Sequence, residues 1–236
     1  MAAGGALSGA ADRVIARGRR LAAHFLEAAE ADIEFADGAF RIAGTDRGIG
    51  IEELARRSYV PGALPMGEDL GLSALLINRP GDATFPNGCH IAEVEVDPET
   101  GETALLSYVV VDDVGTVINP LLVKGQIHGG IAQGLGQVFG EAIRYDAAGQ
   151  MLTASFMDYG MPRAGDFCGL TVLSNPVPTS TNPLGVKGAG EAGTVGALPA
   201  LLGAVVDALR PHGITHLDLP ASPARVWAAI QAASPG

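Results

Sequence analysis

The chain has 236 residues, of which 47% are hydrophobic and 17% charged, a balance that favours a folded chain with a core over a disordered one. The formal net charge of −11, with no basic run, argues against nucleic acid and anionic membrane surfaces as partners. No stretch approaches about 18 apolar residues and the start lacks a secretory pattern, while the two cysteines favour a reducing, cytoplasmic setting.

Residues 1–58 predict a small lobe of helix, hairpin and helix. Apolar residues at helical spacing predict a helix over residues 8–29, with arginines on its other side. The pair Asp37-Gly38 between two short apolar runs predicts a β-hairpin, and residues 51–58 predict a second helix. Residues 59–88 are rich in glycine and proline and predict an extended surface connection, which must be held by other residues if it is ordered.

Residues 89–236 predict a larger lobe. The segments HIAEVEVD and ETALLSYVVVDD, separated by the turn sequence PETG, predict an antiparallel hairpin. Apolar residues at positions 123, 127, 131, 135, 138 and 139 predict a helix that contains five glycines. Because glycine weakens helices, we expect a group to pack very close to the backbone of this helix.

A strand followed by a turn is predicted in EAIRYDAAGQM, and a further strand is predicted in CGLTVLS. Two more helices are predicted, one over residues 197–209 with Pro199 in its first turn, and one capped by Ser222 with Pro223 at its first position. The fold class predicted is therefore α+β, with a mixed, mostly antiparallel sheet and packed helices.

A glycine-rich segment, GAGEAG (residues 188–193), matches G-x-G-x-x-G and precedes a predicted helix. The dinucleotide-binding fingerprint requires a strand directly before it, but the preceding TSTNPLGVK contains Asn182-Pro183, which disfavours a strand. Two interpretations remain for Glu191. It lies in a glycine-rich turn and favours the positive end of the following helix, or it is an unobstructed, ionised carboxylate that acts as a general base.

Four segments follow one another in the order FPNGCHIAEVEVDPETGE, VDDVGTVINP, GQIHGGIAQGLGQ and GVKGAGEAGTVGALPA. Together they resemble the large subunits of the molybdenum hydroxylases, the family of xanthine dehydrogenase, aldehyde oxidase and carbon monoxide dehydrogenase. The resemblance covers essentially the whole chain and is nearest to bacterial subunits that carry molybdopterin cytosine dinucleotide. It implies that residues 89–236 form the C-terminal lobe of a molybdopterin-binding domain.

The resemblance also implies roles for individual residues. It implies that Glu191 is the general base, which takes a proton from a molybdenum-bound hydroxide that attacks an aldehyde, an N-heterocycle or a similar small substrate, with water as the oxygen source. It implies that Gln126 contacts the pterin and that the neighbouring glycines let the helix backbone approach the cofactor. The cofactor-binding residues implied in this way are Gly125, Gln126, Gly129, Gly130, Lys187, Gly188 and Gly190.

The resemblance implies no metal ligand from the protein, because the pterin dithiolene supplies the sulfur ligands. The remaining candidate ligands are interpreted as structural, with cofactor contact as an alternative for His128; they are Cys89, Cys168, His90 and His128. Asp112 and Asp113 end a predicted buried strand. They are interpreted as caps of the following turn, with an acid/base pair as the alternative.

The large subunits of this family are several times longer than this chain. The resemblance therefore implies a complementary molybdopterin-binding half, and partner subunits that carry iron–sulfur clusters and FAD. Two hypotheses follow. The chain is a catalytic portion that is inactive without these partners, or it is a truncated fragment or docking subunit that binds no cofactor alone.

Overall fold

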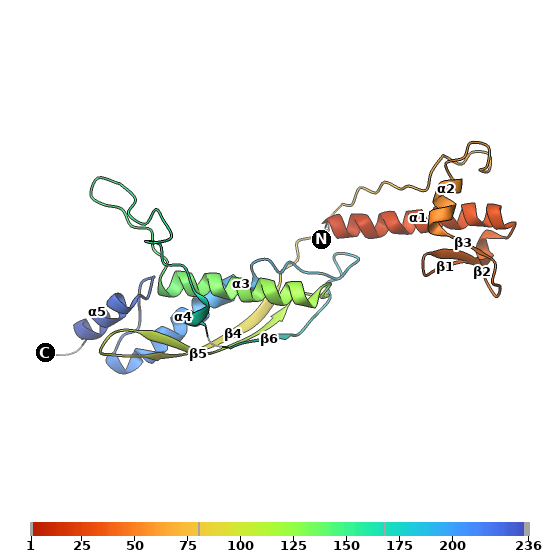
Figure 1. Cartoon of the computed structure of the whole chain (residues 1–236). Coiled ribbons are helices and arrows are strands. Elements are labelled where there is room, and N and C mark those ends of the chain that lie inside the picture. Colours follow the sequence, from red (N-terminus) through yellow and green to blue (C-terminus); the bar gives the residue numbers. More distant parts are fainter. Residues whose placement is uncertain (1, 80, 168, 234–236) are drawn as a thin grey trace. The chain divides into compact units, whose positions relative to one another are not determined.

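The computed structural model describes residues 2–79, 81–167 and 169–233 (Figure 1). The chain forms two compact units, residues 1–81 and residues 82–236. The first unit packs a long helix, a short helix and a three-stranded sheet in the order β1-β2-β3. Its elements are α1 (Ala2–Leu26), the 3-10 turn Glu30–Asp32, β1 (Ile33–Ala36), β2 (Ala39–Ile42), β3 (Gly48–Gly50) and α2 (Ile51–Arg57).

The predicted hairpin and second helix of the first unit are confirmed. Ala36 pairs with Ala39 across β1 and β2, so only Asp37 and Gly38 form the turn. Both have positive φ, 49° and 73°, as a two-residue type I′ turn requires. The core of this unit includes Leu21, Phe40 and Leu54, all fully buried.

Residues 59–79 contain no helix or strand, yet the arginine face of α1 holds them. Arg13 donates a hydrogen bond to the carbonyl of Leu75 at 2.8 Å, and Arg17 donates to the carbonyl of Asp69. Glu68 forms ion pairs with Arg17 and Arg20. The arginines of α1 thus supply the contacts that an ordered extended connection needs.

The second unit contains a three-stranded sheet in the order β4-β5-β6, with β4 at Asn87–Val96, β5 at Thr103–Asp113 and β6 at Leu170–Ser174. The predicted antiparallel hairpin of β4 and β5 is confirmed, whereas β6 pairs with β5 in parallel. The mixed, mostly antiparallel α+β class is thus confirmed. Within residues 141–151 the predicted strand is wrong, whereas the predicted turn is present and is closed by a single bridge between Tyr145 and Met151.

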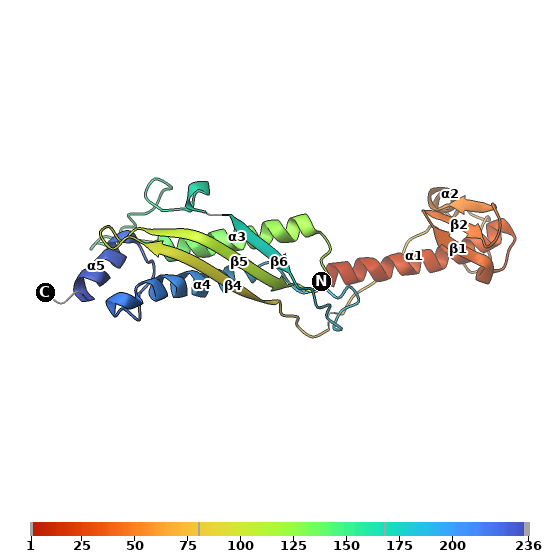
Figure 2. The ribbon, with the colours of Figure 1, turned by 90° about the horizontal axis from the view of Figure 1, so that it is seen from below.

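Two long helices, α3 (Pro120–Phe139) and α4 (Ala192–Ala208), lie together on one face of this sheet (Figure 2). The unit also contains α5 (Pro223–Ala233) and the 3-10 turns Ala164–Asp166 and Arg210–His212. The start of α5 agrees with the prediction, but α4 begins five residues before the predicted Ala197. Pro199 consequently lies inside α4, where it leaves the carbonyl of the exposed Val195 without its helical partner.

The close packing predicted along the glycine-containing helix is confirmed, and the packing group is α4. A Cβ on Gly130 would lie 2.7 Å from the backbone nitrogen of Thr194, and one on Gly193 would lie 2.5 Å from the carbonyl oxygen of Ile127. Glycine therefore sets the separation of α3 and α4. The buried core beneath them includes Tyr108, Val110, Ile131, Leu135, Ala197, Leu201 and Val205.

None of the helices in the described ranges is both long enough and apolar enough to cross a membrane.

Candidate functional site

The segment before GAGEAG is a set of tight turns, all of it within the described residues. Oδ1 of Asn182 accepts hydrogen bonds from the backbone nitrogens of Leu184 and Val186, both at 3.2 Å. Gly185 has a φ of 65°, a left-handed conformation that glycine adopts without strain. Residues 175–190 therefore lack the strand that a dinucleotide-binding fingerprint requires.

Asp113, at the end of β5, fixes both ends of this loop. Its carboxylate accepts hydrogen bonds from the backbone nitrogens of Gly115 at 2.8 Å and Val177 at 3.0 Å, and from Nζ of Lys187. The side chain of Asp113 is 8% exposed. Burial alone would raise its pKa, but the bonds from Lys187, Val177 and Gly115 outweigh burial and lower the pKa to about 2. The predicted capping role of Asp113 is confirmed, and Lys187 is its ion-pair partner.

The lowered pKa of Asp113 predicts a pH-dependent contribution to stability. A carboxylate whose folded pKa is about 2, against an ordinary 3.8, stabilises the fold above the unfolded value and loses that contribution as the pH falls. Above roughly pH 5, this carboxylate should make wild type more stable than Asp113→Asn by a pH-dependent amount of about 2 kcal/mol. That advantage should disappear as the pH falls from roughly 5 to 2, because the carboxylate becomes protonated. Urea denaturation across this range measures it.

The matched control is Asp207→Asn, because Asp207 lies on α4 with its side chain 69% exposed. Its stability difference from wild type should stay nearly constant over the same range. Parallel pH profiles for wild type and Asp113→Asn would show that the bonds from Lys187, Val177 and Gly115 do not lower the pKa of Asp113 in the folded chain.

Gln126 links α3 to the turn that carries Glu191. Its Nε2 donates a hydrogen bond of 2.8 Å to the carbonyl oxygen of Gly190, across 64 positions of sequence. Thr194, just after the turn, donates to the carbonyl of Gly130 and to Oε1 of Gln133. The structure thus brings together Gln126 and Gly190, two predicted site residues from separate segments of the sequence.

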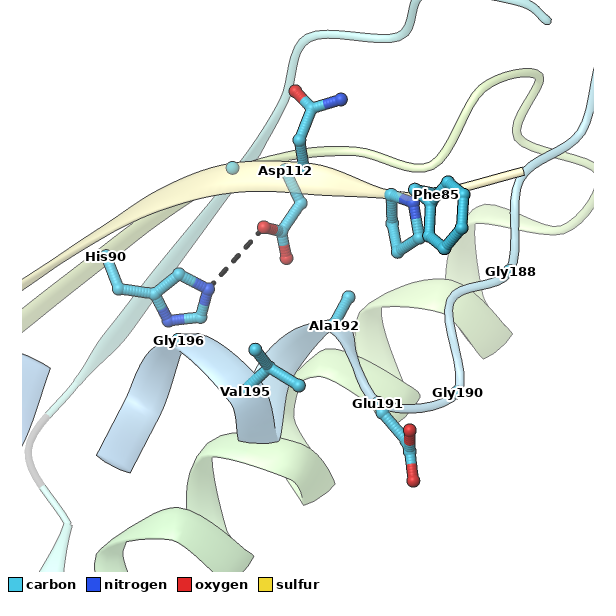
Figure 3. Close-up of a pocket in the computed structure, with 12 residues that line it drawn as sticks. Phe85, His90, Asp112, Gly188, Gly190, Glu191, Ala192, Val195 and Gly196 are labelled. Atoms are coloured by element: carbon cyan, nitrogen blue, oxygen red, sulfur yellow. Dashed lines mark ion pairs between the residues drawn. The ribbon is translucent and has the colours of Figure 1, made fainter. Parts of the chain in front are cut away.

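Glu191 occupies the N-cap position of α4, but its side chain makes no capping hydrogen bond. The residue is exposed, and Figure 3 shows its carboxylate directed away from His90 and Asp112. The carboxylate is therefore free of the local bonds that would occupy a purely structural N-cap. Its position agrees with an accessible, unobstructed carboxylate.

The glycines predicted to bind a cofactor fall into two groups. A Cβ on Gly125 or Gly129 of α3, or on Gly188 or Gly190 of the turn, would meet no atom within 4 Å. Gly130 instead faces α4 and is buried. Four of the five glycines therefore present open backbone near Gln126 and Glu191, whereas Gly130 has a packing role; cofactor contact by all five stays a prediction.

A cavity of about 560 Å³ lies between the start of β4 and the start of α4 (Figure 3). His90 and Asp112 line it, and Nε2 of His90 lies 3.5 Å from Oδ1 of Asp112. The sequence predicts a structural role for His90 and a turn-capping role for Asp112, with acid/base chemistry as the alternative, and it does not predict that the two side chains meet. Strand alternation could have revealed the pair, since His90 shares a face with Ala92 and Val94, while Asp112 shares one with Tyr108 and Val110.

Within the described ranges, no cluster of three or more His, Cys, Asp or Glu side chains could hold a metal ion. Cys89 is a free, exposed cysteine, while Cys168 lies outside the described residues. Nε2 of His128 is buried and has no hydrogen-bond partner among the described residues.

Residues 1–168 match the Molybdopterin cofactor-binding domain family. The carbon monoxide dehydrogenase large chain of Hydrogenophaga pseudoflava is 35% identical over 230 residues, which are 97% of this chain and 28% of that protein. The nicotine 6-hydroxylase large subunit of Paenarthrobacter nicotinovorans is 36% identical over 226 residues, 95% of this chain and 28% of that protein. A solved structure of reconstituted CO dehydrogenase from Oligotropha carboxidovorans matches with a TM-score of 0.87 at 33% identity, covering 98% of this chain and 28% of that chain.

The chain thus spans 28% of the length of these relatives while nearly all of its own residues align with them. The match extends from sequence to backbone geometry, and it includes both compact units because the coverage of this chain reaches 98%. The chain therefore belongs to the molybdenum hydroxylase family, as part of its molybdopterin-binding domain.

Proposed function

We propose that the chain supplies the catalytic base and part of the cofactor cradle of a molybdenum hydroxylase. The enzyme would oxidise an aldehyde, an N-heterocycle or a similar small substrate, with water as the oxygen source. The observation that carries this proposal is the bond from Gln126 to Gly190, which holds the Glu191 turn beside the open glycines of α3. The relatives named for carbon monoxide and nicotine support the chemistry but differ in substrate.

The residues present fit a molybdopterin group. Gly125 and Gly129 on α3, with Gly188 and Gly190 on the turn, leave space that a Cβ would fill. Gln126 adds an amide that is fixed toward the same turn. The bound cofactor, proposed to be the cytosine dinucleotide form, would accept the two electrons released by substrate oxidation and would bring the sulfur ligands of its own metal.

Each side chain then has a separate task. Glu191 takes up a proton at its carboxylate, because the side chain is exposed and no capping hydrogen bond occupies its oxygens. Gln126 orients the turn through Gly190. Lys187 is bound to Asp113, so it holds the loop in place and its charge is already paired.

The proposal includes partners. A complementary molybdopterin-binding half would close the cradle, and subunits with iron–sulfur clusters and FAD would carry the electrons away, all in the cytoplasm. One of the relatives is a large chain and another is a large subunit, which supports an enzyme of several subunits. The alternative is a non-catalytic fragment that binds no cofactor alone, which the coverage of 28% of each relative favours.

Cofactor content separates the two functions. The chain would be purified alone and after co-expression with the remaining segments of a full-length relative, and molybdenum and pterin would be measured in both preparations. We expect cofactor in the assembled preparation and none in the chain alone. If both preparations lack molybdenum although the segments associate, the chain is a non-catalytic fragment.

A further inference from the structure

Two hydrogen bonds join α3 to the start of α4 in a reciprocal way. Nε2 of Gln126 donates to the carbonyl oxygen of Gly190 at 2.8 Å. The hydroxyl of Thr194 donates in the opposite direction, to the carbonyl oxygen of Gly130 at 3.2 Å. In each segment the two positions are four residues apart, a spacing that places them on the same side of a helix. Each segment therefore gives one side chain and one carbonyl group to the other.

Glu191 lies between the two bonded points on its own segment. Gly190 precedes it directly and Thr194 follows three residues later. Figure 3 shows Gly190 and Glu191 at the bend that leads into α4. The backbone that carries the carboxylate is therefore attached to α3 on both sides.

The bend has little of its own to fix it. Glu191 is the N-cap residue of α4 but makes no side-chain capping bond, the contact that usually fixes a helix start. Gly188 and Gly190 precede it, and a Cβ on either would meet no atom within 4 Å. The ion pair with Asp113 holds the loop at Lys187, ahead of these glycines. The direction of the carboxylate therefore depends on the two bonds from α3.

The bond of Thr194 is not a general feature of the packing between the helices. A threonine hydroxyl within a helix often bonds to a carbonyl of the preceding turn. That of Thr194 instead reaches α3, where it also lies 3.0 Å from Oε1 of Gln133. In the described part of the chain, the side-chain hydrogen bonds between α3 and residues 188–208 all lie at this end. The rest of the interface is apolar and buried, with Ile131, Leu135, Ala197 and Leu201.

We infer that Thr194 is a positioning residue for Glu191, because its bond to Gly130 and the bond of Gln126 to Gly190 together hold the direction of the carboxylate. The inference rests on the proposed role of Glu191 as the base, and it adds a second residue that acts through the turn. Misplacement of a catalytic group by about 1 Å can lower a rate by about 10²-fold, so a bond of this kind is expected to affect turnover.

Hydrogen exchange in the purified chain tests the inference without any turnover. The reporter is the backbone amide of Val195, which donates to the carbonyl oxygen of Glu191 at 3.0 Å. Thr194→Val keeps the shape of the side chain but removes the hydroxyl, so exchange at Val195 should rise about tenfold. The amide of Leu209, which donates to Val205 at the other end of α4, should keep its rate.

Two further variants serve as controls. Thr194→Ser keeps the hydroxyl and should recover most of the protection at Val195. Thr171→Val makes the same chemical change at an exposed position of β6 and should leave exchange at Val195 unchanged. No rise at Val195 in Thr194→Val would overturn the inference. An equal rise at Leu209 would also overturn it, since the hydroxyl would then stabilise the whole helix and not the turn.

The fold of Thr194→Val is checked by circular dichroism. Should this variant prove unfolded, Thr194→Ala takes its place, because alanine also removes the hydroxyl and favours a helix. Loss of the fold in both variants would show a purely structural role for Thr194 and overturn the inference.

Turnover of the assembled enzyme connects the bond to the base. With full molybdenum and pterin content, Thr194→Val should lower kcat by about 10- to 100-fold and leave KM nearly unchanged. Thr194→Ser should recover most of this loss. In a Glu191→Gln background the valine should lower kcat by less than about twofold further, because no base remains to be positioned. An equal loss in both backgrounds, or loss of the cofactor, would overturn the inference.

Failure of the proposed function has a different signature. Normal turnover of fully loaded Glu191→Gln would refute the role of base, and exchange at Val195 would still decide whether Thr194 holds the turn. Wild-type turnover of Thr194→Val, beside an impaired Glu191→Gln, would refute the inference alone.

Discussion

Replacement of Glu191 by glutamine is expected to lower turnover of the assembled enzyme by about 10²–10⁴-fold, the contribution of a positioned general base. Glutamine keeps the size and one carbonyl oxygen of the side chain, but it cannot accept the proton. Glu191 makes no capping hydrogen bond, so the fold loses little when its charge is removed. Molybdenum and pterin content should therefore stay close to wild type, and the loss should appear in kcat.

The control for this variant is Glu99→Gln, which makes the same chemical change in the exposed turn between β4 and β5. Its turnover should match wild type. A Glu191→Gln enzyme with full cofactor content and normal turnover would refute the role of base. Loss of the cofactor together with activity would instead show that Glu191 helps to hold the cofactor. Steady-state kinetics alone would not distinguish loss of the base from loss of the cofactor, so molybdenum and pterin must be measured as well.

Replacement of Gly193 by alanine is expected to destabilise the second unit by about 1–3 kcal/mol, the usual cost of overpacking. In an exposed helix the same change would stabilise by up to about 1 kcal/mol, since alanine has the higher helix propensity. Gly193 is different because its Cβ would lie 2.5 Å from the carbonyl oxygen of Ile127 and 3.1 Å from its Cα. Backbone cannot rotate away as a side chain can, so α3 and α4 must separate.

Gly203 provides a matched control, because it lies in the same helix, is exposed and has no atom within 4 Å of a Cβ position. Gly203→Ala should leave stability unchanged or increase it slightly. Chemical denaturation of both variants measures the difference. If Gly193→Ala is as stable as Gly203→Ala, glycine does not set the separation of the two helices.

Local patterns were sufficient for much of the fold. Apolar periodicity predicted α3, and the turn residues Asp37-Gly38 predicted the first hairpin, because these signals act within a few residues. The parallel pairing of β6 with β5 depends on contacts across the whole connection that contains α3, which no local pattern encodes. The sequence predicts a start of α4 that is five residues too late, because proline favours the first turn of a helix. The structure tolerates Pro199 inside α4, because the carbonyl that loses its partner belongs to the exposed Val195.

The site was predicted unevenly for a similar reason. Resemblance supplied Glu191 and Gln126, but the bond from Gln126 to Gly190 depends on the packing of α3 against α4. The cavity pair of His90 and Asp112 depends on the register of two strands and on the glycine at position 196. Side-chain partnerships of this kind require the positions of three elements at once, which the sequence does not specify locally.

The tie between Gln126 and Gly190 has a consequence for mutagenesis of this family. An alanine at position 126 removes any contact with the pterin and also releases the turn that orients Glu191. Its effect on rate therefore combines two losses. A double-mutant cycle with Glu191→Gln would yield a large coupling energy, and the sum of the single effects would overstate what each residue contributes.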